Sequence, residues 1–511
     1  MSTSVSPSND RSFFGHPKGL GLLFMTEMWE RFSYYGLRPL LVLFMAAALA
    51  DGGFGFARPQ ASAIVGIYAA CVDLASLPGG WSADRGLGLR RAILIGAVLI
   101  TAGHLAIGVS GVAGEGVGKP FFFLGLVLIV LGTGLLKPNI SAIVGDLYPE
   151  GGARRDAGFS IFYMGINTGA FIGQLVTGYL GERVSWHWGF GAAGIGMAFG
   201  LLSFWLGARP LLGTLGQDIV RDPDATVQAR REATVRNATV GGLAVLALVF
   251  VLAATGVVAL DPQAIGGAMT FVLVGIAVAF FAYIFAFGGL TGDEKKRSGV
   301  IFVLFVFAAI FWAAFEQAPT SLQLFANDFT DRNLFGFAIP ATWFQSVNSA
   351  FIILFSPVFA ALWVGMAKRN LEFSSPTKFA LGLALAGVGF LLMVFAANKV
   401  VASGGSVLVS PWWLICSYLF QTLGELCLSP VGLSSMTKLS PRRYVGQMMG
   451  IWFLAASVGN LVAGLVGGHV DPTKLEQTPA VFSGTAIALF VATAILGVMI
   501  VPIRKMMAGV K

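Results

Sequence analysis

Charged residues are scarce in this chain of 511 residues. They make up 11% of the sequence, whereas hydrophobic residues make up 56%. A soluble domain carries about 25% charged residues, so this composition excludes an ordinary soluble protein. Together with a mean hydropathy of +0.79, it predicts an all-α integral membrane protein that crosses the bilayer many times. The net charge of +8 comes mostly from predicted loops, so we interpret it as setting membrane orientation and expect no nucleic-acid partner.

Cysteine and histidine are also few, and neither forms a recognisable reactive site. The three cysteines have no metal-ligand spacing, and no histidine lies centrally among the serines of the apolar runs. A membrane enzyme would need a nucleophile with its base, or a metal site. We therefore expect no catalysis, no metal and no cofactor, and carboxylates would have to carry any proton coupling. The residues concerned are Cys71, Cys416, Cys427, His16, His104, His187 and His469.

Fourteen apolar runs are long enough to span a bilayer. An even number places both termini on one side of the membrane. Most lysines and arginines lie in loops on that side, which predicts that both termini are cytoplasmic. The runs are 19–49, 60–83, 91–111, 120–143, 157–180, 188–206, 239–260, 263–290, 298–326, 341–366, 375–398, 411–438, 444–469 and 481–505.

The longest polar interruption divides these runs into blocks. Six runs precede it, two apolar runs without internal charged residues follow it, and six more follow those. This predicts a six-helix bundle over 1–206, a cytoplasmic linker over 207–238, an inserted helix pair over 239–297 and a second six-helix bundle over 298–511.

The first run contains four charged residues. Glu27, Glu30, Arg31, Tyr34 and Arg38 are spaced by three or four, so they share one face of a helix. A charge at the centre of a membrane helix costs roughly 2.5–3.5 kcal/mol. This face must therefore line a bundle interior or a wet cavity. The alternative is that the two acids and two bases neutralise each other and only hold helices together.

Lys137 lies in the fourth run and has no acid within four residues. Its partner must come from another helix, and Glu27, Glu30, Glu316 and Glu425 are the candidates. The alternative is a lysine that extends to the cytoplasmic surface. In the later runs, Tyr163 and Asn167, Trp312 and Glu316, Gln345 and Asn348, and Glu425 and Ser429 form same-face pairs, and Pro430 is expected to break its helix.

Three separated motifs resemble one transporter family. Glu27-x-x-Glu30-Arg31-Phe32 with Tyr34-Tyr35-Gly36 is similar to the first-helix signature of proton-coupled oligopeptide transporters (POT/PTR) of bacterial type. The segments from Phe162 to Ala170 and from Gly424 to Gly432 resemble the family's other signatures. The loop around Asp84 resembles that of the major facilitator superfamily, to which the family belongs.

The resemblance implies a major facilitator fold of two six-helix bundles plus an inserted two-helix hairpin, with 14 transmembrane helices. It also implies import of di- and tripeptides together with protons by alternating access. Arg38 and Lys137 would hold the peptide carboxylate, and Asn167, Asn348 and Glu425 its amino end. The residues shaping side-chain pockets would be Tyr34, Tyr163, Trp312, Trp452 and Ser429. The residues coupling proton binding to rearrangement would be Glu27, Glu30, Arg31, Lys137 and Glu316.

One position departs from the family pattern. Asp73 stands where the family usually has a tyrosine in its second helix. Asp73 would either add a titratable group near the substrate or form an internal ion pair with a base; alternatively, it only caps a local break.

The expected partners are small peptides, protons and the lipid bilayer, and the expected state is a monomer in the bacterial inner membrane. The alternative function is a carrier of the same fold for another small solute, such as nitrate, an amino acid or a peptide-like drug.

Overall fold

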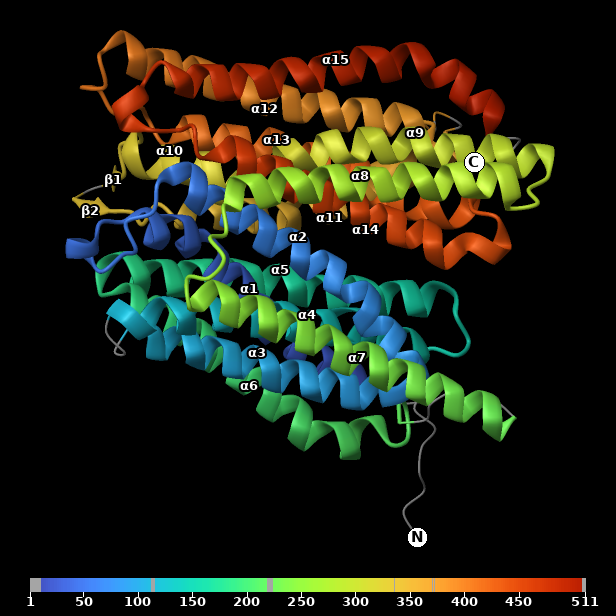
Figure 1. The fold of residues 1–511 in the computed structure, drawn as a ribbon. Coiled ribbons are helices and arrows are strands. Elements are labelled where there is room, and N and C mark those ends of the chain that lie inside the picture. The colour runs from blue at the N-terminus through green and yellow to red at the C-terminus, as the bar shows by residue number, and fades with distance from the viewer. Residues whose placement is uncertain are drawn as a thin grey trace. The chain divides into compact units, whose positions relative to one another are not determined.

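A computed structural model describes residues 11–111, 115–217, 224–334, 336–369, 371 and 373–507. Within these residues the chain is almost entirely helical (Figure 1), which confirms the predicted all-α class. A two-stranded antiparallel hairpin pairs β1 (Asn333–Leu334) with β2 (Phe337–Ala338). The helices are α1 (Lys18–Ala46), α2 (Arg58–Ser82), α3 (Leu89–Ser110), α4 (Glu115–Asp146), α5 (Gly152–Arg183), α6 (Trp186–Leu212), α7 (Ala225–Ala254), α8 (Pro262–Phe287), α9 (Gly292–Phe315), α10 (Gln323–Asp328), α11 (Trp343–Lys368), α12 (Ser375–Ala402), α13 (Trp412–Leu439), α14 (Val445–Gly467) and α15 (Gln477–Met506).

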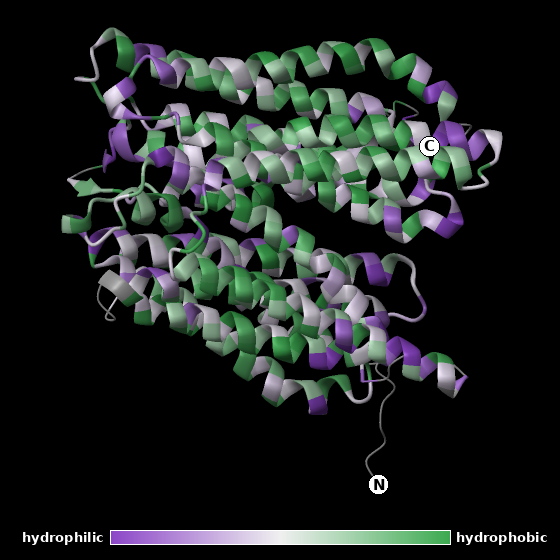
Figure 2. Cartoon of the chain, in the orientation of Figure 1, coloured by the Kyte–Doolittle hydropathy of each residue, from purple (hydrophilic) through white to green (hydrophobic). Residues whose placement is uncertain are grey.

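Thirteen helices in the described part of the chain are long and apolar enough to cross a membrane. The other long helix is α1, with 29 residues, whose middle carries the charged face predicted from the sequence. Hydrophobic residues predominate along the helices, and hydrophilic residues gather at many of their ends and in the loops (Figure 2). Together these helices match the predicted number of spans.

The structure shifts the start of one predicted helix and contradicts a predicted helix break. Helix α7 begins at Ala225, within the polar segment expected to be a linker, and Asp224 caps it by accepting a hydrogen bond of 2.8 Å from the Thr226 amide. The apolar run at 239–260 could not locate the start of α7, because a helix can continue beyond the apolar stretch that spans the bilayer. Pro430 does not break its helix, since α13 continues to Leu439. Neighbouring groups in membrane proteins satisfy the backbone groups that such a proline frees.

The chain forms two compact units. Unit 1 contains Met1–Leu37 and Cys71–Leu260, and unit 2 contains Arg38–Ala70 and Asp261–Lys511. Both α1 and α2 therefore contribute residues to each unit. Helix α7 belongs to unit 1 and α8 to unit 2, so the two inserted helices belong to different units.

In unit 1 the closest helix pair is α3 with α4. A Cβ atom on Gly96 would lie 2.6 Å from the Gly132 carbonyl oxygen, and one on Gly132 would lie 2.6 Å from the Gly96 oxygen. Gly103 and Gly125 repeat this arrangement two turns away. Helix α6 packs against α3 and α5. Small residues thus let the backbones touch, as is usual where helices associate within a bilayer.

In unit 2 the corresponding pair is α12 with α13, which run side by side (Figure 1). Gly382 and Gly424 face each other's backbones, and a Cβ atom on either would lie within 2.9 Å of the other's carbonyl oxygen. Helices α3 and α4 are the third and fourth helices of the first six, and α12 and α13 are the third and fourth of the last six. The same packing device thus occurs at equivalent positions of the two blocks.

The first half of α2 packs against α14 within unit 2. A Cβ atom on Gly66 would lie 2.6 Å from the Asn460 carbonyl oxygen and 2.8 Å from Gly464 Cα. The Ser457 hydroxyl also donates to the Ala70 carbonyl over 3.4 Å. This contact holds α2 next to the helix that carries Asn460.

Gly66→Leu is expected to destabilise the protein by about 1–3 kcal/mol, the usual cost of overpacking. The added side chain would force α2 and α14 apart, because backbone atoms and not flexible side chains occupy the space. A lower melting temperature of the purified protein in detergent would show this. Gly275→Leu on α8 is the matched control, since a Cβ atom there meets nothing within 4 Å. An equal effect of both substitutions would contradict the close contact.

Candidate functional site

A buried charge cluster forms in unit 1 around the first helix. Arg31 Nε lies 2.8 Å from Glu27 Oε1 and 3.1 Å from Glu30 Oε2. The two glutamates are at most 1% exposed. From α4, the Thr133 hydroxyl donates to Glu30 over 3.4 Å. The helical spacing predicted that these three charges would share a face, and the structure shows one arginine shared by two carboxylates.

Lys137 pairs with a carboxylate on α2. Its Nζ lies 3.0 Å from Asp73 Oδ1, and both side chains keep partial exposure. The ion pair foreseen as one of the alternatives for Asp73 is therefore present. The four glutamates proposed as partners of Lys137 did not include this residue, because only the packing of α2 on α4 places it there.

Arg38 lies at the centre of a second cluster, in unit 2. Its guanidinium pairs with Glu316, which ends α9, and donates to Asn460 Oδ1 on α14 over 2.9 Å. A π-helical turn, η4 (Ala318–Leu322), follows Glu316. Glu316 and the expected carboxylate-binding Arg38 are thus bound to each other in this structure.

Asn348 and Glu425 also meet in unit 2. The amide nitrogen of Asn348 on α11 donates to Thr422 Oγ1 over 2.9 Å and to Glu425 Oε2 over 3.3 Å, both on α13. Ser429 is half-buried one turn further along α13. The two residues expected to hold an amino end are therefore adjacent.

The residues expected to shape side-chain pockets are dispersed within the two units. In unit 1, Tyr34 is buried, whereas Tyr163 is 45% exposed. Asn167 donates to the carbonyl of Tyr163 on the same helix over 3.1 Å. In unit 2, Trp452 is 5% exposed, and Trp312 is half-buried.

Glycines provide the space for both tryptophans. The Trp452 ring lies over Gly432 of α13 and beside Phe379 of α12, with ring centroids 6.4 Å apart. At Trp312 the Cβ atom and the main chain, not the ring, lie against Gly459 of α14. The contacts with Gly432 and Phe379 fix the orientation of the Trp452 ring.

Sequence reasoning missed several polar partners. Thr133 lies four residues before Lys137, and Thr422 three before Glu425, so helical spacing could have identified both. Arg58 on α2 pairs with Asp328 at the end of α10, and Arg58 also donates to the Val470 carbonyl over 3.0 Å. No local pattern in the sequence connects Arg58 with Asp328.

The described surroundings of three histidines lie away from these clusters. His16 hydrogen-bonds to the Tyr148 hydroxyl over 2.8 Å. Burial and the neighbouring Arg154 lower the pKa of His16, and burial raises the pKa of Tyr148 to about 12. His104 is buried on α3, and His469 contacts the Val466 carbonyl.

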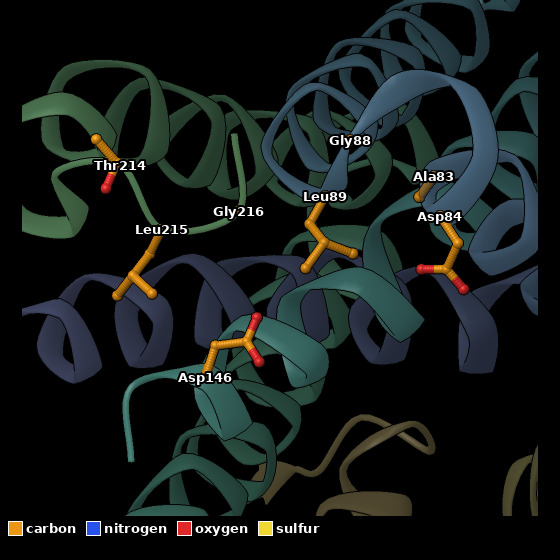
Figure 3. A pocket seen from close by; sticks show the side chains of 8 residues that line it. All are labelled: Ala83, Asp84, Gly88, Leu89, Asp146, Thr214, Leu215 and Gly216. Atoms are coloured by element: carbon orange, nitrogen blue, oxygen red, sulfur yellow. The ribbon is translucent and has the colours of Figure 1, made fainter. Parts of the chain in front are cut away.

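A pocket of about 300 Å³ lies elsewhere in unit 1, at the ends of α2 and α4. Asp84 and Asp146 line it together with Leu89 and Leu215 (Figure 3). The Arg90 guanidinium donates to the Gly213 carbonyl over 2.6 Å, which ties the segment after α6 to this region. None of the predicted site residues borders this pocket, so we do not assign it to the functional site.

Comparison with known proteins gives consistent matches. The POT family model (PTR2) matches residues 90–220 and 249–481. The peptide transporter YePEPT of Yersinia enterocolitica is 49% identical over 507 residues, covering 99% of this chain and 98% of the relative. A di-/tripeptide transporter of Lactococcus lactis is 36% identical over 516 residues, covering 98% of this chain and 99% of the relative.

A solved structure of a peptide transporter POT in complex with sulfate superposes with a TM-score of 0.88. It is 39% identical, and the match covers 98% of this chain and 97% of that chain. These matches confirm the expected major facilitator fold and a multi-pass membrane protein. The chain belongs to the POT family of transporters.

Proposed function

We propose that this chain is a proton-coupled symporter that imports di- and tripeptides by alternating access. Its relatives carry names of peptide and di-/tripeptide transporters. The observation that carries the proposal is the presence of acids and bases together inside apolar spans of both units. A carrier for zwitterionic peptides needs both signs of charge, and a structural scaffold does not. It would act as a carrier and not as an enzyme.

The proposed roles follow from the positions of the acidic and basic side chains in the two units. Lys137 and Arg38 would hold the carboxylate end of the peptide, and Asn348, Asn167 and Glu425 its amino end. Because Arg38 is bound to Glu316 in the structure, a proton on Glu316 would release Arg38 for the substrate. The side-chain pockets would be shaped by Tyr34, Tyr163, Trp312, Trp452 and Ser429.

Proton coupling would depend on the buried acids Glu27 and Glu30 with Arg31, and on Glu316. Protonation of a carboxylate removes one negative charge from a cluster, which weakens its hold on the paired base. Substrate and proton together would then leave the site nearly neutral, so the rearrangement would not carry bare charge through an apolar region. We further propose a monomer in the bacterial inner membrane with cytoplasmic termini.

The deciding experiment is uptake of labelled dialanine into proteoliposomes, with and without an inward proton gradient. We expect accumulation that depends on the gradient and is competed by other dipeptides but not by free amino acids. Uptake without any effect of the gradient would contradict coupling. If the folded protein takes up no dipeptide, the proposed substrate class is wrong. The remaining interpretation is then a carrier of the same fold for another solute.

A further inference from the structure

Asp73 and Lys137 face each other because their helices are in backbone contact. A Cβ atom on Gly134 of α4 would lie 2.6 Å from the Ala75 carbonyl oxygen of α2. Gly79 of α2 meets the Gly134 backbone even more closely. No side chain larger than hydrogen fits at these crossing points. The ion pair of 3.0 Å is thus set by the main chains and not by two long side chains that meet by chance.

The pair differs from the neighbouring cluster in its accessibility. The Asp73 and Lys137 side chains are 17% and 26% exposed, whereas those of Glu27, Glu30 and Arg31 are at most 6% exposed. Asp73 and Lys137 are therefore partly open to water, whereas the three α1 charges are almost completely covered by protein atoms.

The two adjoining clusters of unit 1 together contain three acids and two bases. Glu27, Glu30 and Asp73 are acids, and Arg31 and Lys137 are bases. Thr133, one turn before Lys137 on α4, donates to Glu30, so the two groups of charges adjoin. Arg31 already forms ion pairs with two carboxylates. If the carboxylate of a ligand forms an ion pair with Lys137, Asp73 loses the ion pair that the structure shows.

We propose that Asp73 is a specificity-determining counter-ion. It holds Lys137 until the carboxylate of a substrate displaces it, and it then pairs with a basic side chain next to that carboxylate. Removing one partner of a half-buried ion pair is unfavourable, and a substrate cation restores the balance. The favoured ligands are di- and tripeptides with lysine or arginine at the C-terminus. The inference rests on the proposed function, because it assumes that Lys137 binds the peptide carboxylate.

The test compares Ala-Lys with Lys-Ala as competitors of labelled dialanine uptake in proteoliposomes. The two competitors have the same composition and differ only in the position of the basic side chain. For the unmodified protein we expect Ala-Lys to compete about fivefold better, the effect of one partly exposed ion pair. Asp73→Asn should abolish this preference, and Asp73→Glu should keep it. Asp156→Asn, which removes an exposed carboxylate of α5 in the same unit, should also keep it.

The outcomes separate the two proposals. Dialanine uptake without a preference for Ala-Lys, or an unchanged preference in Asp73→Asn, would overturn this inference alone. Absence of dipeptide uptake by the unmodified protein would overturn the proposed function and this inference with it. If Asp73→Asn folds but does not transport, binding is compared instead. The rise in melting temperature caused by Ala-Lys is then set against the rise caused by Lys-Ala. Asp73→Tyr provides a second variant without the charge.

Discussion

Glu30→Gln is expected to abolish the accumulation of dialanine against its gradient while dialanine still exchanges across the membrane. Glutamine cannot take up or release a proton, so transport would lose its driving force. One proton moving through roughly 100 mV supplies about 2.3 kcal/mol, which corresponds to roughly fiftyfold accumulation. In the variant the concentrations inside and outside should become equal. Uptake driven by a gradient and counterflow without one measure these two properties separately.

The geometry explains why exchange should persist. Glu27 stays paired with Arg31 at 2.8 Å, and the amide of glutamine can still accept from Thr133. The fold and the remaining site are therefore kept. Glu232→Gln on α7, which removes an exposed carboxylate of unit 1, should leave accumulation unchanged. Full accumulation by Glu30→Gln would assign coupling to another carboxylate, with Glu316 the next to test.

Arg38→Met is expected to destabilise the protein by about 3–5 kcal/mol and to abolish both uptake and counterflow. Removing one partner of a buried ion pair leaves an uncompensated charge, which costs more than the pair itself contributes. Here Glu316, whose side chain is 14% exposed, would lose its guanidinium partner. The same substitution removes a group proposed to bind the peptide carboxylate. Melting temperature and counterflow of dialanine measure the two effects.

A double-mutant cycle separates stability from substrate binding. Arg38→Met combined with Glu316→Gln removes both charges and should recover most of the lost stability, but it should not recover transport. Arg504→Met, at an exposed position of α15, is the control for loss of a guanidinium. Recovery of transport in the double variant would show that Arg38 only neutralises Glu316.

The two clusters differ in how far the sequence foretold them. Spacing along one helix predicted the triad of Glu27, Glu30 and Arg31, because residues three and four apart share a face. The same spacing also assigned Arg38 to that face. The structure adds that Arg38 belongs to unit 2, where Glu316 and Asn460 contact it. Helical periodicity cannot reveal that one helix contributes to two packing units.

The partner of Lys137 shows the same limit. The sequence required a carboxylate from another helix, because none lies within four residues, and it singled out Asp73 as a departure from the family pattern. It could not connect the two residues. The connection depends on the backbone contact of α2 with α4 at Gly79 and Gly134, which brings residues 64 positions apart into contact.

Composition and periodicity by themselves determined that this chain is an all-α membrane protein with charged faces inside its spans, because a bilayer admits few other arrangements of such a sequence. The motifs identified the family. Tertiary structure decided which charges neutralise each other, where α7 begins and that α13 continues past Pro430. These features depend on which helices touch. Close contacts at small residues such as Gly134 and Gly66 select the neighbours, and a buried charge then pairs with whatever group the neighbouring helix presents.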